Sequence, residues 1–558
     1  MGPVANYEPC LPVPGEMPVK GDCLPFARIP HSTRLFIDFL SYSPNLQQFY
    51  PRSPSLNEWL KQETPAERYD AARRQRVSDV LERQNKSWAA SSKTHANIAR
   101  LRKGASAVVT GQQVGLFGGP LFSILKALTA IKLAEEATAA GVDAVPVFWL
   151  ATNDHDLAEV NHTILPGPEA SLQKLEVSSH GPEDAPVGTV AFGPEIEPIV
   201  QAAADLLGSS AIGDFLRESY RPGENLGSAF ARLFTRVFAE WGVILLDPSD
   251  RDLHAVAQPI YSAAIERVVE IDEALLARGK ALEAAGYHQQ VKVTPSSTLL
   301  FVLKDGARLP IHRRTNGNDA VEFLMNDSRL TREELQQQIA DAPQEFSPNV
   351  LLRPVVQDYL LPTLAYTGGA AEVAYFAQAG VVYQALLGHV TPIVPRFSAT
   401  IIEPKPRALL ERYQLALPEV FHGPDTLREK LAEKILPPEL QKAFDNAGVN
   451  LQQAMAAIRD ALASLDKTLV DAADNAGSKM QHQLESLRAR AARAELRQSE
   501  IAGRHAQQLS NALFPNKTLQ EREIAAISYL SRYGLEFLST LHSFLHTDCY
   551  DHQVITLD

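Results

Sequence analysis

The sequence predicts a doubly wound α/β protein that ends in a long helical coiled coil. Within the first part, a β-branched run at 105–111, a glycine-rich loop, a helical stretch and an apolar run at 145–151 form a predicted βαβ unit. After about residue 404 the composition turns to Ala, Leu, Gln, Glu and Arg with a regular apolar seam. At 558 residues the chain has room for three or four structural units.

The elements of the α/β part follow in order along the chain. Helically spaced apolar residues between Ser55 and Arg102 predict one or two long helices before the first strand. The helix after the glycine-rich loop ends at the C-cap candidate Gly141. The strand 145–151 is apolar on both faces, as a buried parallel strand requires. Further strands are predicted at 242–247, 351–356, 364–369 and 392–397, each near a helical segment.

Two segments interrupt this alternation of strands and helices. They are predicted to be insertions that flank the sheet as small lids. Residues 163–200 are rich in Pro and Gly and predict short strands and loops. Residues 291–314 predict a hairpin that turns at Asp305 and Gly306.

The apolar seam predicts one helix of about 60 residues that runs to Leu513 and measures roughly 90 Å. Such a helix must pack on another helix, and two arrangements stay open: a hairpin on residues 424–446 of the same chain, or a dimer. A capping-box candidate, Thr518 to Glu521, opens a final helix. The seam consists of Leu451, Met455, Ile458, Leu462, Leu465, Leu469, Ala472 and Ala476.

Composition excludes several classes of protein. The formal charge of −13 argues against nucleic-acid binding, which favours basic surfaces. No apolar run is long enough to span a membrane, and the proline-rich N-terminus lacks the pattern of a secretory signal. The odd set Cys10, Cys23 and Cys549 argues against a disulfide framework and for a reducing compartment, so we expect a cytoplasmic protein.

The loop after the first strand is the first candidate site. Its glycines precede a helix that is predicted to begin near Pro120, where backbone amides and the positive helix end could hold an anion. The spacing matches no phosphate-loop motif, and a tight structural turn is the alternative. Gln112 and Gln113, two neutral amides at the strand end, favour binding of a polar ligand over a purely structural turn. We assign substrate or phosphate binding to Thr110, Gly111, Gln112, Gln113, Gly115, Gly118 and Gly119.

The segment ATNDHDLAEVNH follows the second strand and so lies at the ligand edge of the predicted sheet. Asp154, His155, Asp156 and His162 are the catalytic candidates, and Asn153 and Asn161 are binding candidates. The two histidines would share a face if the segment were helical. No metal motif is present, so we assign no metal site. The alternative is helix-capping aspartates with a packed histidine.

A third cluster gathers near the strands at 351–356 and 364–369. Its arginines could bind a carboxylate or phosphate bidentately, or could form internal salt bridges with Asp358 or Glu372. The binding candidates here are Arg353, Asp358, Thr367, Gly368, Gly369, Glu372 and Arg396.

Four motifs together resemble one known family. They are TGQQVGLFGGPLF, PVFWLATNDHDLAEVNH, LRPVVQDYLLPTLAYTGGAAEVAYFAQ and ALFPNKTLQERE, in this order. They are similar to the BshC family, the cysteine ligases of bacillithiol biosynthesis, over most of the chain. The sequence departs from that pattern at TGGAAE, where a GGPGE-type turn is expected, and at its proline-rich start.

The resemblance implies a Rossmann-like core with two connecting-peptide insertions and a coiled coil that forms a homodimer. It implies that L-cysteine is joined to glucosamine malate by an amide bond. The fold is similar to class I aminoacyl-tRNA synthetases, but HIGH and KMSKS signatures are absent, so ATP or another nucleotide is an analogy and the cofactor is unknown. The implied division is 1–162 (N-terminal helices and first half of the core), 163–235 (first insertion), 236–285 (core), 286–345 (second insertion), 346–404 (second half of the core), 405–515 (coiled coil) and 516–558 (a C-terminal helix that packs back on the core).

For this reaction we expect the helix N-terminus at Gly118 to Pro120 to stabilise an activating phosphate. His155 or His162 would take the proton of the attacking amine, with Asp154 or Asp156 fixing its tautomer. The alternatives are another nucleotide-dependent ligase that acts on a small amine or acid, and a non-catalytic scaffold that binds a ligand.

Overall fold

The computed structural model describes residues 19–63, 65–178, 181–182, 184–315, 321–325, 328–434, 438–498 and 500–558. The chain divides into two compact units. The first contains the described residues up to Gly167, then Leu172–Thr400 and Glu521–Ile555; the second contains mainly Ile401–Gln520. Cys10 lies outside the described residues, and the thiols of Cys23 and Cys549 are free. None of the described helices is long and apolar enough to cross a membrane.

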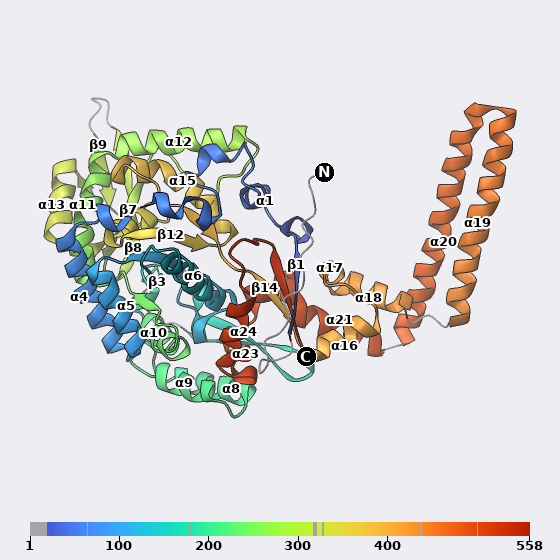
Figure 1. The fold of residues 1–558 in the computed structure, drawn as a ribbon, viewed down its shortest axis with the longest axis horizontal. Coiled ribbons are helices and arrows are strands. Elements are labelled where there is room, and N and C mark those ends of the chain that lie inside the picture. Colours follow the sequence, from blue (N-terminus) through green and yellow to red (C-terminus); the bar gives the residue numbers. More distant parts are fainter. Residues whose placement is uncertain are drawn as a thin grey trace. The chain divides into compact units, whose positions relative to one another are not determined.

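A five-stranded parallel sheet forms the centre of the first unit (Figure 1). Its strand order is β13 (Ile393–Pro395), β12 (Thr363–Gly368), β2 (Ser106–Gln112), β3 (Ala144–Leu150) and β6 (Ile244–Leu246). The helix α6 (Phe122–Ala139) connects β2 to β3 and ends just before Gly141. The predicted βαβ unit and parallel sheet are therefore confirmed.

Helices cover both faces of this sheet, as alternate residues of β2 show. Val108 packs in one apolar cluster with Leu133 of α6, whereas Val109 packs in another with Val77 and Ile98. The last two residues come from α4 (Ala71–Ser87) and α5 (Ser92–Lys103), the long helices predicted before the first strand. A doubly wound sheet is the arrangement that buries both faces in this way.

The strand predicted at 351–356 is wrong, because this segment forms the helix α14 (Arg353–Leu360). The carboxamide oxygen of Asn349 accepts hydrogen bonds from the amides of Leu351 and Leu352, both at 3.0 Å, and so caps the start of the helix. Pro354 lies in the first turn, where a missing N–H costs nothing. Local capping therefore overrides the apolar run.

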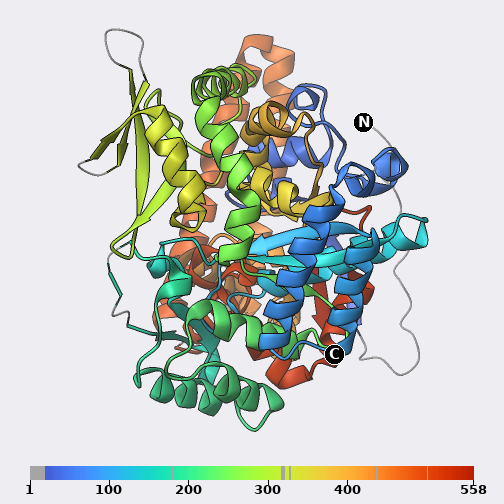
Figure 2. The ribbon, with the colours of Figure 1, turned by 90° about the vertical axis from the view of Figure 1, so that its left-hand side faces the viewer.

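The segment predicted to be the second insertion contains the predicted hairpin (Figure 2). Strands β7 (Ser297–Lys304) and β8 (Ala307–Thr315) pair antiparallel with Lys304 opposite Ala307. Asp305 and Gly306 have φ values of 53° and 81°, the left-handed conformation of a two-residue hairpin turn, which confirms the prediction. In the region of the predicted first insertion, 163–235, lie the strand pair β4 (His162–Pro166) and β5 (Leu172–Glu176) and then the helices α8 (Ile196–Leu207), α9 (Ala211–Ser219) and α10 (Leu226–Val237).

The coiled-coil seam lies on two helices, so the single long helix is wrong. Helices α19 (Pro438–Leu465) and α20 (Val470–Gln498) run side by side (Figure 1). The chain reverses at Asp466, whose extended backbone ends α19 and whose carboxylate accepts from the amide and hydroxyl of Thr468, both at 2.8 Å. The second half of the seam is therefore one partner, and α18 (Pro424–Lys434) also packs against α20, so the predicted packing on residues 424–446 is confirmed in part. The chain then continues into α21 (Glu500–Leu513).

Asn85 couples α4 to the edge strand β6 and gives a test of the packing of the sheet. Its buried amide donates to the carbonyl of Leu245 at 2.8 Å and accepts from the amide of Leu245 at 3.1 Å. Asn85→Ala should lower the free energy of unfolding by about 2–4 kcal/mol, because it leaves both backbone groups without partners. Urea unfolding measures this change, with the exposed neighbour Lys86→Ala as control; equal stability of the two variants would contradict it.

Candidate active site

A cavity of about 790 Å³ opens at the carboxyl edge of β2, β3 and β12, within the first unit. Parallel strands bring their carboxyl ends to one edge, and ligands of open α/β sheets bind there. The predicted site residues that line it are Gly111, Gln112, Gln113, Asn153, Asp154, Arg353, Gly369, Glu372 and Arg396. Sequence reasoning missed other lining residues with polar groups, among them Lys126, Glu159, Arg308, Tyr366, Tyr375 and Arg522.

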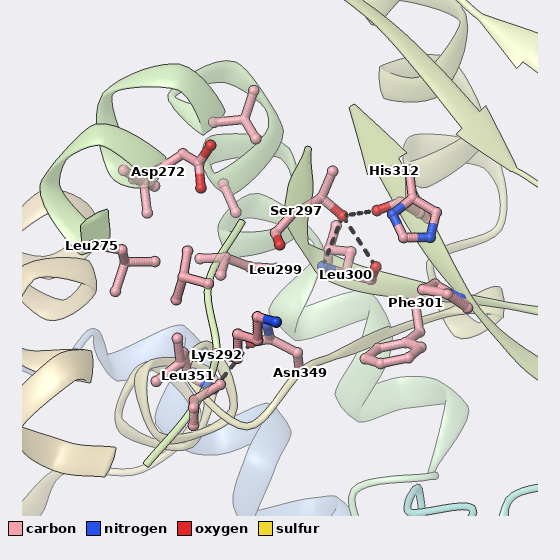
Figure 3. Close-up of a pocket in the computed structure, with 18 residues that line it drawn as sticks. Asp272, Leu275, Lys292, Ser297, Leu299, Leu300, Phe301, His312, Asn349 and Leu351 are labelled. Carbon is pink, nitrogen blue, oxygen red and sulfur yellow. Dashed lines mark hydrogen bonds between the residues drawn. The ribbon is translucent and has the colours of Figure 1, made fainter. Parts of the chain in front are cut away.

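A smaller cavity of about 180 Å³ lies between the β7–β8 hairpin and α12 (Val268–Ala284), and Figure 3 shows its lining. Lys292, Phe301 and Asn349 line both cavities. Apart from them the lining is mostly apolar. Its buried carboxylate, Asp272, accepts from Arg313 Nη2 at 2.5 Å. Among the residues that line this cavity, Asp272 is the one carboxylate, and it is held in this ion pair.

The glycine turn after β2 does not line the larger cavity, apart from Gly111. The Gly118 amide donates to the carbonyl of Gly115 at 3.1 Å and to the hydroxyl of Tyr220 at 3.2 Å, and the Gly119 amide donates to Leu116. Gly118 has a φ of 87°, and an added Cβ would lie 3.2 Å from Leu233. These amides thus already have acceptors inside the protein. Anion binding by this turn stays a prediction.

Lys126 is a buried lysine on α6, with 4% of its side chain exposed. Its ammonium donates to the Gly111 carbonyl and to Gln112 Oε1, both at 2.8 Å, and pairs with Glu372 Oε2 at 2.6 Å. Burial lowers the pKa of Lys126 from 10.5 to about 8, although Glu372 acts in the opposite direction. A lone lysine in the apolar stretch LFSILKALTAI is the signal that could have identified this residue.

Glu372 lies at the start of α15 (Ala370–Leu387), directly after β12. Its carboxylate accepts from the Gly369 amide at 2.7 Å and from the Tyr366 hydroxyl at 2.5 Å. Burial alone would raise the pKa of Glu372, but Lys126, Tyr366 and Gly369 together hold it below its usual value. The internal salt bridge that the sequence offered as an alternative for Glu372 exists, with Lys126 in place of an arginine.

Arg353 forms no ion pair with a carboxylate among the described residues. It donates to the Tyr375 hydroxyl at 2.6 Å and to Gln357 at 3.2 Å. Burial alone would lower its pKa, but Tyr375, Tyr366 and Glu372 raise it, so the guanidinium stays charged. Asp358, the other predicted partner, is buried apart from the cavity and accepts from Tyr383 at 2.6 Å.

Arg396 pairs with Glu521, at 2.6 and 3.1 Å, so it forms an internal salt bridge, but with a partner other than the predicted Asp358 or Glu372. Glu521 is 1% exposed and also accepts from the Ala399 amide and the Ser398 hydroxyl. It belongs to the short helix α22 (Gln520–Glu523). The predicted capping box from Thr518 to Glu521 is wrong, because this carboxylate is bound to Arg396 and its neighbours.

The DHD segment is divided between the cavity and the surface. Asp154 lines the cavity and accepts from Gln113 Nε2 at 3.0 Å. Asp156 caps the short helix α7 (Leu157–Val160), accepting from the Glu159 amide at 3.2 Å. His162 begins β4, so the two histidines do not share a helix face. Asn161 donates to Glu176 at 3.2 Å, outside the cavity lining.

His155 faces Arg308 of the hairpin strand β8. Arg308 Nη1 lies 3.0 Å from His155 Nδ1, whereas the nearest Asp154 oxygen is 3.8 Å from that nitrogen. Because a guanidinium only donates, Nδ1 must accept, and in the neutral ring the proton is on Nε2. Arg308 therefore fixes the tautomer. Burial lowers the pKa of Arg308 to about 10, and among the described residues it forms no ion pair with a carboxylate.

The remaining predicted residues lie in the body of the sheet. Thr110 is fully buried in β2, and its hydroxyl donates to the Thr367 carbonyl on β12 at 2.9 Å. Thr367 and Gly368 end β12 but do not line the cavity. The hydrogen bond between Thr110 and Thr367 joins β2, which ends at Gln112, to β12, which precedes the helix that carries Glu372.

His552 supports Ser398, beside Glu521, and gives a pH-dependent test. Its two ring nitrogens lie 2.8 Å from the hydroxyls of Ser398 and Thr400, and burial lowers its pKa from 6.5 to about 4. The unfolded chain binds this proton more tightly, so the neutral ring stabilises the fold above pH 6.5 and this contribution is lost on acidification.

Between pH 7 and pH 5 the wild type should therefore lose about 2 kcal/mol of stability that His552→Gln does not lose. Urea unfolding at several pH values measures the difference. Gln553→Ala, which alters a neighbouring non-titrating residue, serves as control and should shift stability equally at all pH values. Parallel pH curves for the wild type and His552→Gln would contradict the assignment.

Comparisons with known proteins agree with this architecture. Residues 20–397 match the model described as "Bacillithiol biosynthesis BshC, N-terminal Rossmann-like domain", and residues 399–557 match its C-terminal coiled-coil domain. These matches confirm the expected Rossmann-like core and coiled coil.

Curated relatives match over nearly their whole lengths. A protein from Koribacter versatilis is 51% identical over 96% of this chain and 99% of its own. Relatives from Solibacter usitatus (35% identical, 96% of this chain and 99% of its own) and Salinibacter ruber (34%, 93% and 96%) carry the same name, "Putative cysteine ligase BshC". The chain therefore belongs to the BshC family of bacillithiol biosynthesis.

Proposed function

We propose that this chain is a ligase that joins the carboxyl group of L-cysteine to the amino group of glucosamine malate. The relatives named as cysteine ligases support the cysteine substrate. The observation that carries the proposal is the composition of the large cavity. Arg308 and Arg353 enter it without carboxylate partners, and Asp154 and Glu159 lie on its wall. A ligase of this kind needs both an anion site and a group that accepts a proton.

Arg308 and Arg353 can bind the acidic groups of the substrates. Amide formation from a free carboxylate requires that one of its oxygens becomes part of a leaving group, and the activated group carries negative charge. Arg353 stays charged at every physiological pH, and Arg308 with a pKa of about 10 does so at neutral pH. Their donors can orient carboxylate or phosphate oxygens in the cavity. An activating nucleotide such as ATP would place its phosphates here, by the same chemistry.

The carboxylates on the cavity wall, Asp154 and Glu159, can accept the proton that the attacking amine loses. When the amino group attacks the acyl carbon, the C–N bond forms, the activating group leaves, and the nitrogen loses a proton. Asp154 is 35% exposed at the cavity wall and can accept that proton. His155 is less suited in this arrangement, because Arg308 occupies Nδ1 and Nε2 holds the proton. We therefore assign the general base to Asp154, with Glu159 beside it.

Asp154→Asn should reduce kcat about 10²-fold or more with little change in melting temperature, since it removes a proton acceptor and preserves shape. The assay contains purified protein, cysteine, glucosamine malate and ATP, and it follows bacillithiol, AMP and ADP separately. Asp305→Asn, at the exposed hairpin tip, is the matched control. A wild type that consumes neither substrate would contradict the proposed ligase activity. Full activity in Asp154→Asn would contradict the assignment of Asp154 as the general base.

We also propose that the chain forms a homodimer through the α19–α20 hairpin. Part of the seam packs inside the hairpin, but Ile458, Leu465, Met480 and Leu487 are 48%, 78%, 50% and 56% exposed. Exposed apolar residues repeated along one pair of helices are typical of a surface that another helix covers. A second copy of the hairpin presents the same apolar residues and fits this surface.

Leu465→Glu combined with Leu487→Glu should convert the dimer to a monomer that stays folded, because both side chains are exposed within one chain. Sedimentation at micromolar concentration measures the mass, and circular dichroism checks the fold. The control is Gln453→Glu, an exposed substitution outside the seam. A wild type that sediments as a monomer would refute the dimer.

A further inference from the structure

We propose that Lys126 is a positioning residue that fixes the orientation of Gln112 and Gln113 and, through them, of the carboxylates Asp154 and Glu159. The inference rests on the proposed ligase function, in which those carboxylates receive the proton of the amine. It explains why two adjacent glutamines, the last residue of β2 and the residue after it, stand at the edge of the cavity.

Lys126 has no N–H donor left for a substrate. An ammonium group has three N–H donors. The acceptors at the Gly111 carbonyl, Gln112 Oε1 and Glu372 Oε2 lie at 2.8, 2.8 and 2.6 Å. All three donors are therefore used inside the protein, and the role left to Lys126 is to hold other groups in place.

The charge of Lys126 also fixes the direction of the hydrogen bonds that Gln112 and Gln113 make. Because Lys126 only donates, Gln112 must turn its oxygen toward it and its amide nitrogen away. That nitrogen donates to Gln113 Oε1 at 3.4 Å, so Gln113 in turn presents its own nitrogen to Asp154 Oδ2 at 3.0 Å and Glu159 Oε2 at 2.6 Å. A cation at one end and two carboxylates at the other thus determine how both amides point.

Gln113 in turn donates to two carboxylates, Asp154 and Glu159. Asp154 and Glu159 carry like charges and would separate in solution. One NH2 group of Gln113 bonds to both, which holds them together at the cavity wall. The Asp154 oxygen that is not bonded to Gln113 accepts from the His155 amide at 2.8 Å. If Gln113 rotates, Asp154 loses one of the two contacts that fix its position.

The test must separate this positioning role from the ion pair itself. Lys126→Met alone leaves Glu372 buried without its partner and can prevent folding. The double variant Lys126→Met with Glu372→Gln removes both charges and keeps the volume. Glu372→Gln alone shows what the loss of that carboxylate does, and Gln112→Met breaks the next link while Lys126 and Glu372 remain.

In the double variant kcat should fall about 10- to 100-fold below that of Glu372→Gln alone, with KM changed less than about threefold, because Asp154 is misplaced but the substrate groups on Arg353 remain bound. Adding Gln112→Met should cause no further loss, since both changes break one chain. Losses that multiply, or full kcat in a folded double variant, would overturn the proposal.

A crystal structure of the double variant provides a readout that does not depend on turnover. The Gln113 amide is expected to leave Asp154 or Glu159. A Gln113 that keeps both contacts without Lys126 would overturn the inference even if the wild type proves to be inactive as a ligase. Conversely, an inactive wild type with a displaced Gln113 would refute the ligase function and leave the positioning role intact.

Discussion

The parallel pairing of β12, β2 and β3 is the constraint on which the rest of the first unit depends. In this register Thr110 lies between Thr367 and Phe148, so three segments far apart in the sequence end at the same edge. The chain then places an amide pair, a pair of carboxylates and a buried glutamate after those strand ends. Each polar group reaches the cavity because its strand is long enough and is buried on both faces.

Much of this sheet could be predicted from the sequence, because strands buried on both faces form short, almost purely apolar runs. The failures have local causes. A carboxamide from Asn349 caps a helix where the apolar run at 351–356 suggested a strand. A single aspartate, Asp466, ends α19 although the apolar seam continues past it. Periodicity reports which face is apolar, but the direction of the chain is decided by residues that satisfy the backbone groups at helix ends.

The candidate site was predictable in position and less so in composition. Glycines, amides and carboxylates after a strand are visible in the sequence, but their roles depend on partners that the fold supplies. Arg308 reaches the cavity from an insertion, and Glu521 reaches Arg396 from a segment 125 positions later. No local pattern connects such pairs. The tautomer of His155 could not be predicted from the sequence for the same reason. Arg308, 153 positions away, determines which ring nitrogen is protonated.

The contribution of Glu521 has a consequence for how the protein is made. The first unit contains Glu521–Ile555, so its interior is closed by residues that the ribosome adds after the α19–α20 hairpin. Until then Arg396 lacks Glu521, the carboxylate that pairs with it in the folded protein. The nascent chain thus carries an unfinished cavity through the synthesis of more than a hundred residues.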